Sequence, residues 1–153
     1  MYSINEELLK EKNKNSFSED YKRRILDSFK HLNEDDKILV LLSQIIGNRF
    51  KATKKIVHET FFELREKFPR HFKNFYFSTN ENYPFSKKLD DIFFRFQNYR
   101  ALSMENPDYD IYLISDKTKD IIKKDLLPRV KVEDKRFFND LPKMAEFIKK
   151  RLE

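Results

Sequence analysis

The chain has 153 residues, 39% of them hydrophobic and 38% charged, with sixteen Phe and a net charge of +6. This length and apolar content suit one folded domain and exclude a disordered tail. The absence of cysteine excludes disulfides, cysteine-zinc sites and thiol nucleophiles, and three scattered histidines predict no metal site. Because no apolar run reaches membrane-spanning length and the N-terminus lacks a secretory signal, we expect a cytoplasmic protein without membrane contact.

The chain begins with two predicted helices, over residues 4–12 and 20–32, which we interpret as an N-terminal helical extension covering 1–33. Asn33 is a suitable N-cap, and acids at 34–36 match the positive end of a helix. The apolar residues that follow predict a core helix ending at Gly47.

A second long helix is predicted over 52–68, stopping before Pro69, and the aromatic stretch 71–77 suits a strand. Ser86 can cap a third helix. Apolar residues on that helix recur at helical spacing, so its core-facing side is predicted: Leu89, Ile92, Phe93 and Phe96.

Two short strands are predicted within 100–115, joined by a polar turn at 105–108. A helix then begins after Ser115 and is expected to stop before Pro128, and a basic amphipathic helix over 141–152 follows.

This order of elements is typical of a winged helix-turn-helix. We therefore predict a mainly helical α+β fold, with a winged-helix domain over 34–127 and a C-terminal helical extension over 128–153. The helix after Ser86 would be the recognition helix, and residues 103–109 the wing.

Four stretches, ILVLLSQI, KATKKIVHETFF, YPFSKKLDD and YLISDKTKDI, are similar to successive landmarks of the phage-associated, SocA-like (Panacea) antitoxin family. The resemblance spans roughly 35–125 and implies a winged-helix fold. Pro84, Ser86 and Lys87 agree with the family's turn before the third helix. Tyr83, Phe85 and Thr118 stand where that family has glycine, tyrosine and glycine.

Half of the excess positive charge lies in residues 70–102, which hold six basic and three acidic residues. Within them, Lys87 and Lys88 occupy the positive end of a helix, where acids are usual. They can converge with free N–H groups on a DNA phosphate. Alternatively, they pair with Asp90 and Asp91 on the same helix as a solvated face.

Basic and amide side chains around the predicted recognition helix and the second helix are the candidate DNA contacts. They are Lys51, Lys54, Lys55, Ser86, Lys87, Lys88, Arg95 and Asn98. Asp90 and Asp91 oppose base readout, and Glu105 and Asp108 make the wing tip acidic.

Phe94 lies on the outer side of the recognition helix, and Phe147 and Ile148 lie on the C-terminal helix. We expect these three residues at a protein interface, most simply that of a homodimer.

Catalysis has little support, and we expect no enzyme, no catalytic residue and no cofactor. His58-Glu59 lacks the second histidine of a zincin, a single glycine allows no phosphate loop, and residues 133–135 suit a charged turn better than a nuclease strand. The leading hypothesis is a DNA-binding transcription regulator acting on double-stranded DNA. The alternative is an antitoxin-like or adaptor module that binds protein without DNA.

Overall fold

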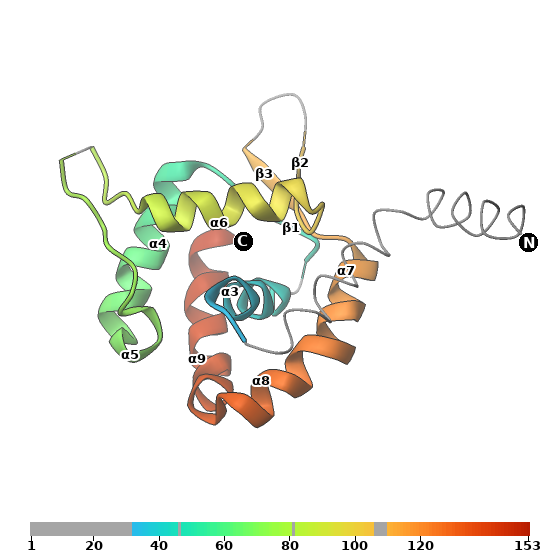
Figure 1. Cartoon of the computed structure of the whole chain (residues 1–153). Helices are drawn as coiled ribbons and strands as arrows, with labels where there is room; N and C mark the ends of the chain where they lie inside the picture. Colours follow the sequence, from blue (N-terminus) through green and yellow to red (C-terminus); the bar gives the residue numbers. More distant parts are fainter. Residues whose placement is uncertain (1–31, 46, 81, 106–109) are drawn as a thin grey trace, which may run out of the picture.

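The computed structural model describes residues 32–45, 47–80, 82–105 and 110–153. This part of the chain is mainly helical, with one small antiparallel sheet (Figure 1). The helices are α3 (Glu34–Ser43), α4 (Lys54–Lys67), α5 (Pro69–Phe72), α6 (Lys87–Asn98), α7 (Asp116–Ile121), the π-helical turn η1 (Ile122–Leu126), α8 (Leu127–Glu133) and α9 (Lys135–Leu152).

The sheet has three strands, β1 (Arg49–Lys51), β2 (Ser103–Met104) and β3 (Ile111–Leu113), in the order β1-β3-β2. The middle strand, β3, pairs antiparallel with both neighbours, and Tyr112 lies opposite Phe50 on one side and Met104 on the other. The two short strands predicted within 100–115 are therefore confirmed. The turn between them lies largely outside the described residues.

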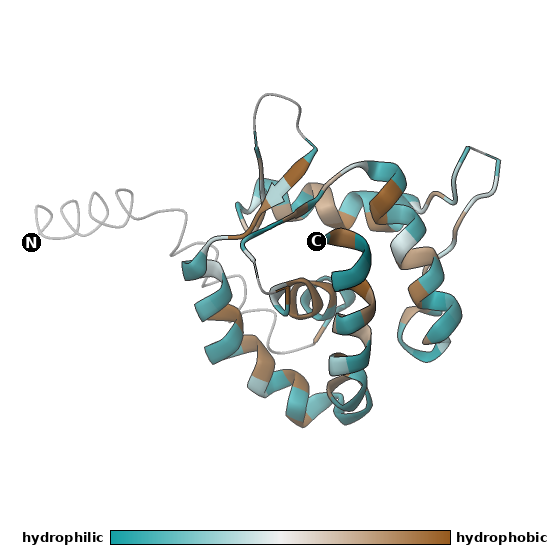
Figure 2. Cartoon of the chain, turned by 180° about the vertical axis from the view of Figure 1, so that it is seen from behind, coloured by the Kyte–Doolittle hydropathy of each residue, from teal (hydrophilic) through white to brown (hydrophobic). Residues whose placement is uncertain are grey.

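Helix α3 forms the centre of the core, seen nearly end-on in the middle of Figure 1. Five consecutive residues, Ile38 to Leu42, are buried, so no side of this stretch faces water. Figure 2 accordingly shows α3 as predominantly hydrophobic and surrounded by other helices. Its start is the predicted one, because the Asn33 side chain accepts a hydrogen bond from the Asp36 N–H (2.9 Å) and Asp36 accepts one in return.

Helix α3 ends at Ser43, before the predicted stop at Gly47. Two carbonyls just beyond the helix are satisfied from α7, since the Lys119 ammonium group donates to the carbonyl oxygens of Ile45 (2.6 Å) and Gly47 (2.7 Å). A cation is favourable at this negative end of a helix. Lys119 thereby connects α7 to the end of α3.

The strand predicted over 71–77 is replaced by a short helix and an irregular segment. Pro69 begins α5, because its fixed φ suits the first helical turn and its missing N–H is not needed there. Phe72, Phe75 and Phe77 are all buried in the core. Their aromatic character therefore reflects burial, and the nearest strand-like pairing in the described residues is the bridge between Phe85 and Ser78, the residue after this stretch.

The helix predicted to stop before Pro128 instead continues through it into α8. A proline ring clashes with the carbonyl one turn earlier in a regular α-helix. The wide turn η1 precedes it, with the Leu127 N–H bonded five residues back to the Ile122 carbonyl, which relieves that clash. The domain boundary expected between residues 127 and 128 falls inside this helical run.

The C-terminal helix is longer than predicted and belongs to the main core. Helix α9 begins at Lys135 and includes Pro142, and it packs against α3, α4 and α8. Its buried residues are Phe137, Leu141, Met144, Ala145, Ile148 and Leu152. Residues 128–153 are thus an integral part of one hydrophobic core with 34–127. The N-terminal extension predicted over 1–33 lies almost entirely outside the described residues.

Replacing Ile148 with alanine should lower the free energy of unfolding by about 2–5 kcal/mol, because its side chain is fully buried between helices. The exposed Phe94→Ala control should change stability by less than about 0.5 kcal/mol. Urea unfolding of both variants followed by circular dichroism measures the difference. An Ile148→Ala variant as stable as the parent would contradict the burial of this residue.

Candidate nucleic-acid interface

Helix α6, the expected recognition helix, begins at a serine that lies wholly inside the protein. Ser86 is 0% exposed, and its hydroxyl accepts a hydrogen bond from the Leu89 N–H (3.2 Å). The predicted N-cap is confirmed. The predicted DNA contact of Ser86 is corrected, because a fully buried hydroxyl that caps its own helix cannot reach a ligand.

A buried histidine of α4 positions the start of α6. The Nδ1 atom of His58 accepts a hydrogen bond from the Ser86 N–H (3.0 Å), and its ring stacks on Phe85 with centroids 4.6 Å apart. Because Nδ1 accepts, the ring proton lies on Nε2, which is 3.8 Å from a carboxylate oxygen of Asp90. Burial lowers the pKa of His58 to about 4, against the opposing effect of Asp90. The ring is therefore neutral at neutral pH.

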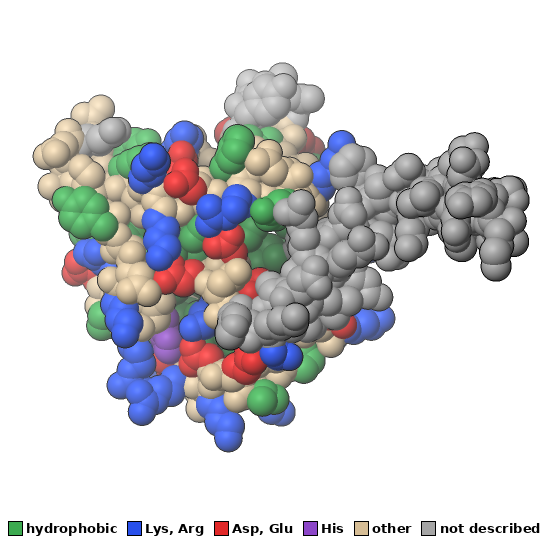
Figure 3. Space-filling view, in the orientation of Figure 1, with side chains coloured by type: hydrophobic (Ala, Val, Ile, Leu, Met, Phe, Trp, Pro, Cys, Tyr) green, Lys and Arg blue, Asp and Glu red, His purple; other side chains and the backbone are tan. Residues whose placement is uncertain are grey.

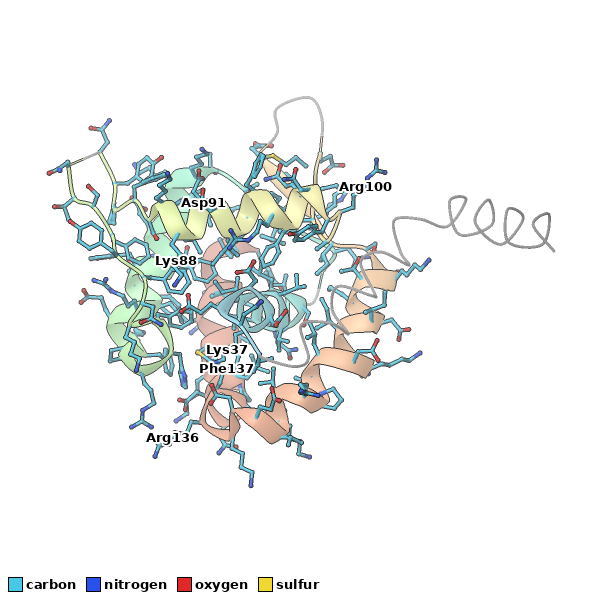
Figure 4. The ribbon with its side chains drawn as sticks, viewed as in Figure 1. Lys37, Lys88, Asp91, Arg100, Arg136 and Phe137 are labelled. Carbon is cyan, nitrogen blue, oxygen red and sulfur yellow. The ribbon has the colours of Figure 1, made fainter. Side chains whose placement is uncertain are left out.

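Two basic residues of α6 are paired with the acids that open α3. The Arg95 guanidinium donates two hydrogen bonds to the Asp35 carboxylate, at 2.7 and 3.0 Å, and Lys88 lies 2.5 Å from Glu34. Figure 4 shows Lys88 on the side of α6 that faces α3, and Asp91 on the other side. Lys88 therefore does not pair with Asp91, which was one of the predicted contacts within the helix.

The contact with Lys88 also affects the titration of the Glu34 carboxyl. Burial alone would raise its pKa, but hydrogen bonds from Lys88 and Asn74 outweigh burial, and the pKa is lowered. The charged form is thus favoured in the folded protein. Lys88 and Arg95, two of the predicted DNA contacts, are engaged within the protein.

Two further cations near α6 also have partners. The Lys54 ammonium lies 3.3 Å from Asp90, so this predicted contact joins the start of α4 to α6. Arg49 of β1 lies 3.0 Å from Glu105, which follows β2. Glu105, which was predicted at an acidic wing tip, is therefore paired across the sheet, whereas Asp108 lies outside the described residues.

The remaining predicted contacts form an exposed group. Among the described residues, Lys51, Lys55 and Lys87 are exposed and have no ion pair, and Asn98 is also exposed. Helical spacing places Lys87, Asp91, Phe94 and Asn98 along the side of α6 opposite its buried residues. We call these four residues the outer ridge.

Figure 3 shows blue and red side chains interleaved over α6 and α3, so the basic side chains over these two helices do not form a continuous patch. This distribution agrees with the ion pairs just described. The positive charge of the 70–102 segment is thus partly cancelled by acids of α3.

The three predicted interface residues have different surroundings. Phe94 is 63% exposed on the outer ridge, as expected for a contact residue. Ile148 is 0% exposed, which corrects its assignment to an interface. Phe147 is partly buried, and its ring lies under the Lys67 ammonium (4.6 Å) and the Arg151 guanidinium (5.4 Å).

No known family model matches this chain, and no curated protein or solved structure matches it either. Within the described residues, no three metal-ligating side chains gather in one place. No helix in that same part of the chain combines the length and apolarity needed to cross a membrane.

Acidification should destabilise the fold through His58. The folded-state pKa of about 4 lies below the ordinary 6.5, so between these values the unfolded chain binds the proton more readily. The free energy of unfolding should therefore fall by about 2 kcal/mol between about pH 7.5 and pH 5. The stabilising contribution of His58 should be completely lost below about pH 4. Urea unfolding at each pH gives this slope.

The matched variant is His58→Asn, whose amide oxygen can replace Nδ1 as acceptor of the Ser86 N–H but does not titrate. Its stability should change much less over the same pH interval. An unchanged slope in His58→Asn would show that other groups cause the acid sensitivity.

Proposed function

We propose that this chain is a winged helix-turn-helix protein that binds double-stranded DNA, in the manner of a transcription regulator. The order α3, β1, α4, α6, β2, β3 and the sheet order β1-β3-β2 support this proposal. In this interpretation α6 is the recognition helix and the β2–β3 hairpin is the wing, which lies beside the C-terminal half of α6 in Figure 1.

The observation that carries the proposal is a set of exposed cations beside the solvent-facing side of α6. Lys87 opens α6, and Lys51 and Lys55 lie at β1 and the first turn of α4. The Lys54–Asp90 ion pair brings that first turn next to α6. Unpaired lysines at neighbouring helix starts suit phosphate groups, because the helix dipoles add to their positive potential.

Base readout should be weak. Gln97, which could address a base, has its amide near the Tyr112 hydroxyl (3.2 Å), and Arg95 is held by Asp35. On the outer ridge Asn98 alone has a side chain suited to pairing with adenine, next to the acidic Asp91 and the apolar Phe94. We therefore propose binding that depends mainly on the DNA backbone.

Duplex affinity should fall with salt, with a slope of about −2.7 in log K against log salt if three lysines each neutralise one phosphate. The triple variant Lys51→Glu, Lys55→Glu, Lys87→Glu should lose at least about tenfold in affinity at low salt. Fluorescence anisotropy with a labelled duplex measures both quantities.

The matched control replaces Lys117, Lys123 and Lys135 with glutamate, which changes net charge equally at exposed positions of α7, η1 and α9. It should keep most of the affinity. Equal loss in both triple variants would leave only net charge as the cause, and no binding by the parent would reject DNA as a partner.

The exposure of Phe94 favours a second candidate, a protein-interaction module of antitoxin-like or adaptor type. A ring that is 63% exposed in the middle of a helix face is typical of a contact residue. A homodimer through this ridge is the simplest form of such an interaction.

Light scattering tests the homodimer, since one chain weighs 18.8 kDa. The parent should show about twice that mass at micromolar concentration, and Phe94→Glu should return it to one chain. Tyr76→Glu is the control, because the Tyr76 side chain is even more exposed (79%) than that of Phe94 but lies outside α6. A parent already at 18.8 kDa would exclude this dimer.

A further inference from the structure

A second concentration of cations lies between α4 and α9, away from the residues of the proposed DNA contact. A groove of about 390 Å³ is lined there by Lys67, Lys143, Glu146, Phe147, Lys150 and Arg151. Four of these six side chains are basic and one is acidic. The groove therefore offers a positive, concave surface with an aromatic ring.

Helical spacing explains why these side chains converge. Lys143, Phe147 and Lys150 are separated by four and three residues, so they share one face of α9. Lys67 comes from the last turn of α4, which packs against α9. Each helix thus contributes one rim of the groove. The packing of α4 against α9 fixes how far apart the basic residues on the two rims begin.

The acidic residues near this groove neutralise only part of its positive charge, so the groove can accept an anion. Lys67 and Lys143 have no ion pair among the described residues. Lys150 lies 3.7 Å from Glu146, but both side chains are more than 70% exposed, and such pairs contribute little. Arg151 is paired with Glu63. Two lysines without a countercharge and one weakly paired lysine therefore surround the groove.

The ring of Phe147 adds an apolar surface between the cations. Lys67 and Arg151 both lie over this ring, at 4.6 and 5.4 Å from its centroid. Cation–π attraction of this kind keeps the two charged groups beside the groove. A ligand with an anionic group and an adjoining planar part can contact both the lysines and the ring edge.

We propose that this groove binds a phosphate-bearing small molecule, with Lys67, Lys143 and Lys150 on the phosphates and Phe147 beside the organic part. Its volume suits a ligand of nucleotide size. A polyanionic chain would need cations spaced along a track, whereas these are gathered around one ring. The site goes beyond the proposed DNA function and does not depend on it.

The two surfaces can be tested separately. Lys55 and Lys67 stand twelve residues apart on α4, which places them roughly 18 Å apart along the helix axis. Charge reversal at Lys67 and Lys143 should therefore leave duplex binding nearly unchanged. The triple variant at Lys51, Lys55 and Lys87, which should weaken duplex binding, should likewise retain binding in the groove.

Isothermal titration calorimetry of the full chain with ADP, and separately with inorganic pyrophosphate, provides the test. We expect saturable binding of one ADP per chain with a Kd of about 1 mM or lower. The double variant Lys67→Glu, Lys143→Glu should weaken both probes more than about tenfold, and the control Lys123→Glu, Lys135→Glu should weaken neither to that extent.

Phe147→Leu separates the role of the ring from that of the charges, since leucine preserves an apolar side chain against the core. It should weaken ADP more than pyrophosphate. Absence of saturable binding by either probe, or equal loss in the control variant, would overturn the proposal. Tighter binding of a single-stranded oligonucleotide at the same lysines would also overturn it, in favour of a polymer site.

Discussion

The ion pairs between α6 and the first turn of α3 are the constraint on which the proposed interface depends. Arg95 forms two hydrogen bonds with Asp35, and Lys88 contacts Glu34. Bidentate pairs of this type fix geometry as well as adding energy. On the opposite flank, Asp90 is held by Lys54. With both flanks held, α6 cannot rotate about its axis without breaking charged contacts, so its outer ridge faces solvent.

The acidic residues in the first turn of α3 therefore have two effects, one on their own helix and one on α6. Glu34 and Asp35 lie at the positive end of their own helix, where negative charge is stabilising, and each also neutralises a cation of α6. A net charge of +6 consequently gives a poor guide to the potential around α6. In the part of the chain that the structure describes, the exposed lysines without an ion pair beside α6 are Lys51, Lys55 and Lys87, which come from three different elements.

Local signals in the sequence predicted much of this fold, and distant contacts account for most of what it missed. Caps at Asn33 and Ser86 were predictable because a capping side chain bonds to its own neighbours. The pairing of Arg95 with Asp35 spans sixty residues, and periodicity carries no information about it. In the sequence His58 was considered only as half of a zincin motif, and its Ser86 partner lies 28 residues away in the chain, so no local pattern predicted this contact. Pro128 was read as a stop because a π-helical turn has no clear sequence pattern.

The apolar side of α9 is buried in the core, so it cannot form the interface of a homodimer. Once Ile148 and its neighbours are part of the core, the largest exposed apolar side chain left on a long described helix is Phe94. Phe94 lies between Lys87 and Asn98 on the outer ridge, the same residues proposed to meet DNA. A partner chain seated on Phe94 would cover those contacts, so pairing through this ridge and duplex binding exclude each other. On this argument the protein concentration at which chains pair would set the fraction of ridges open to DNA.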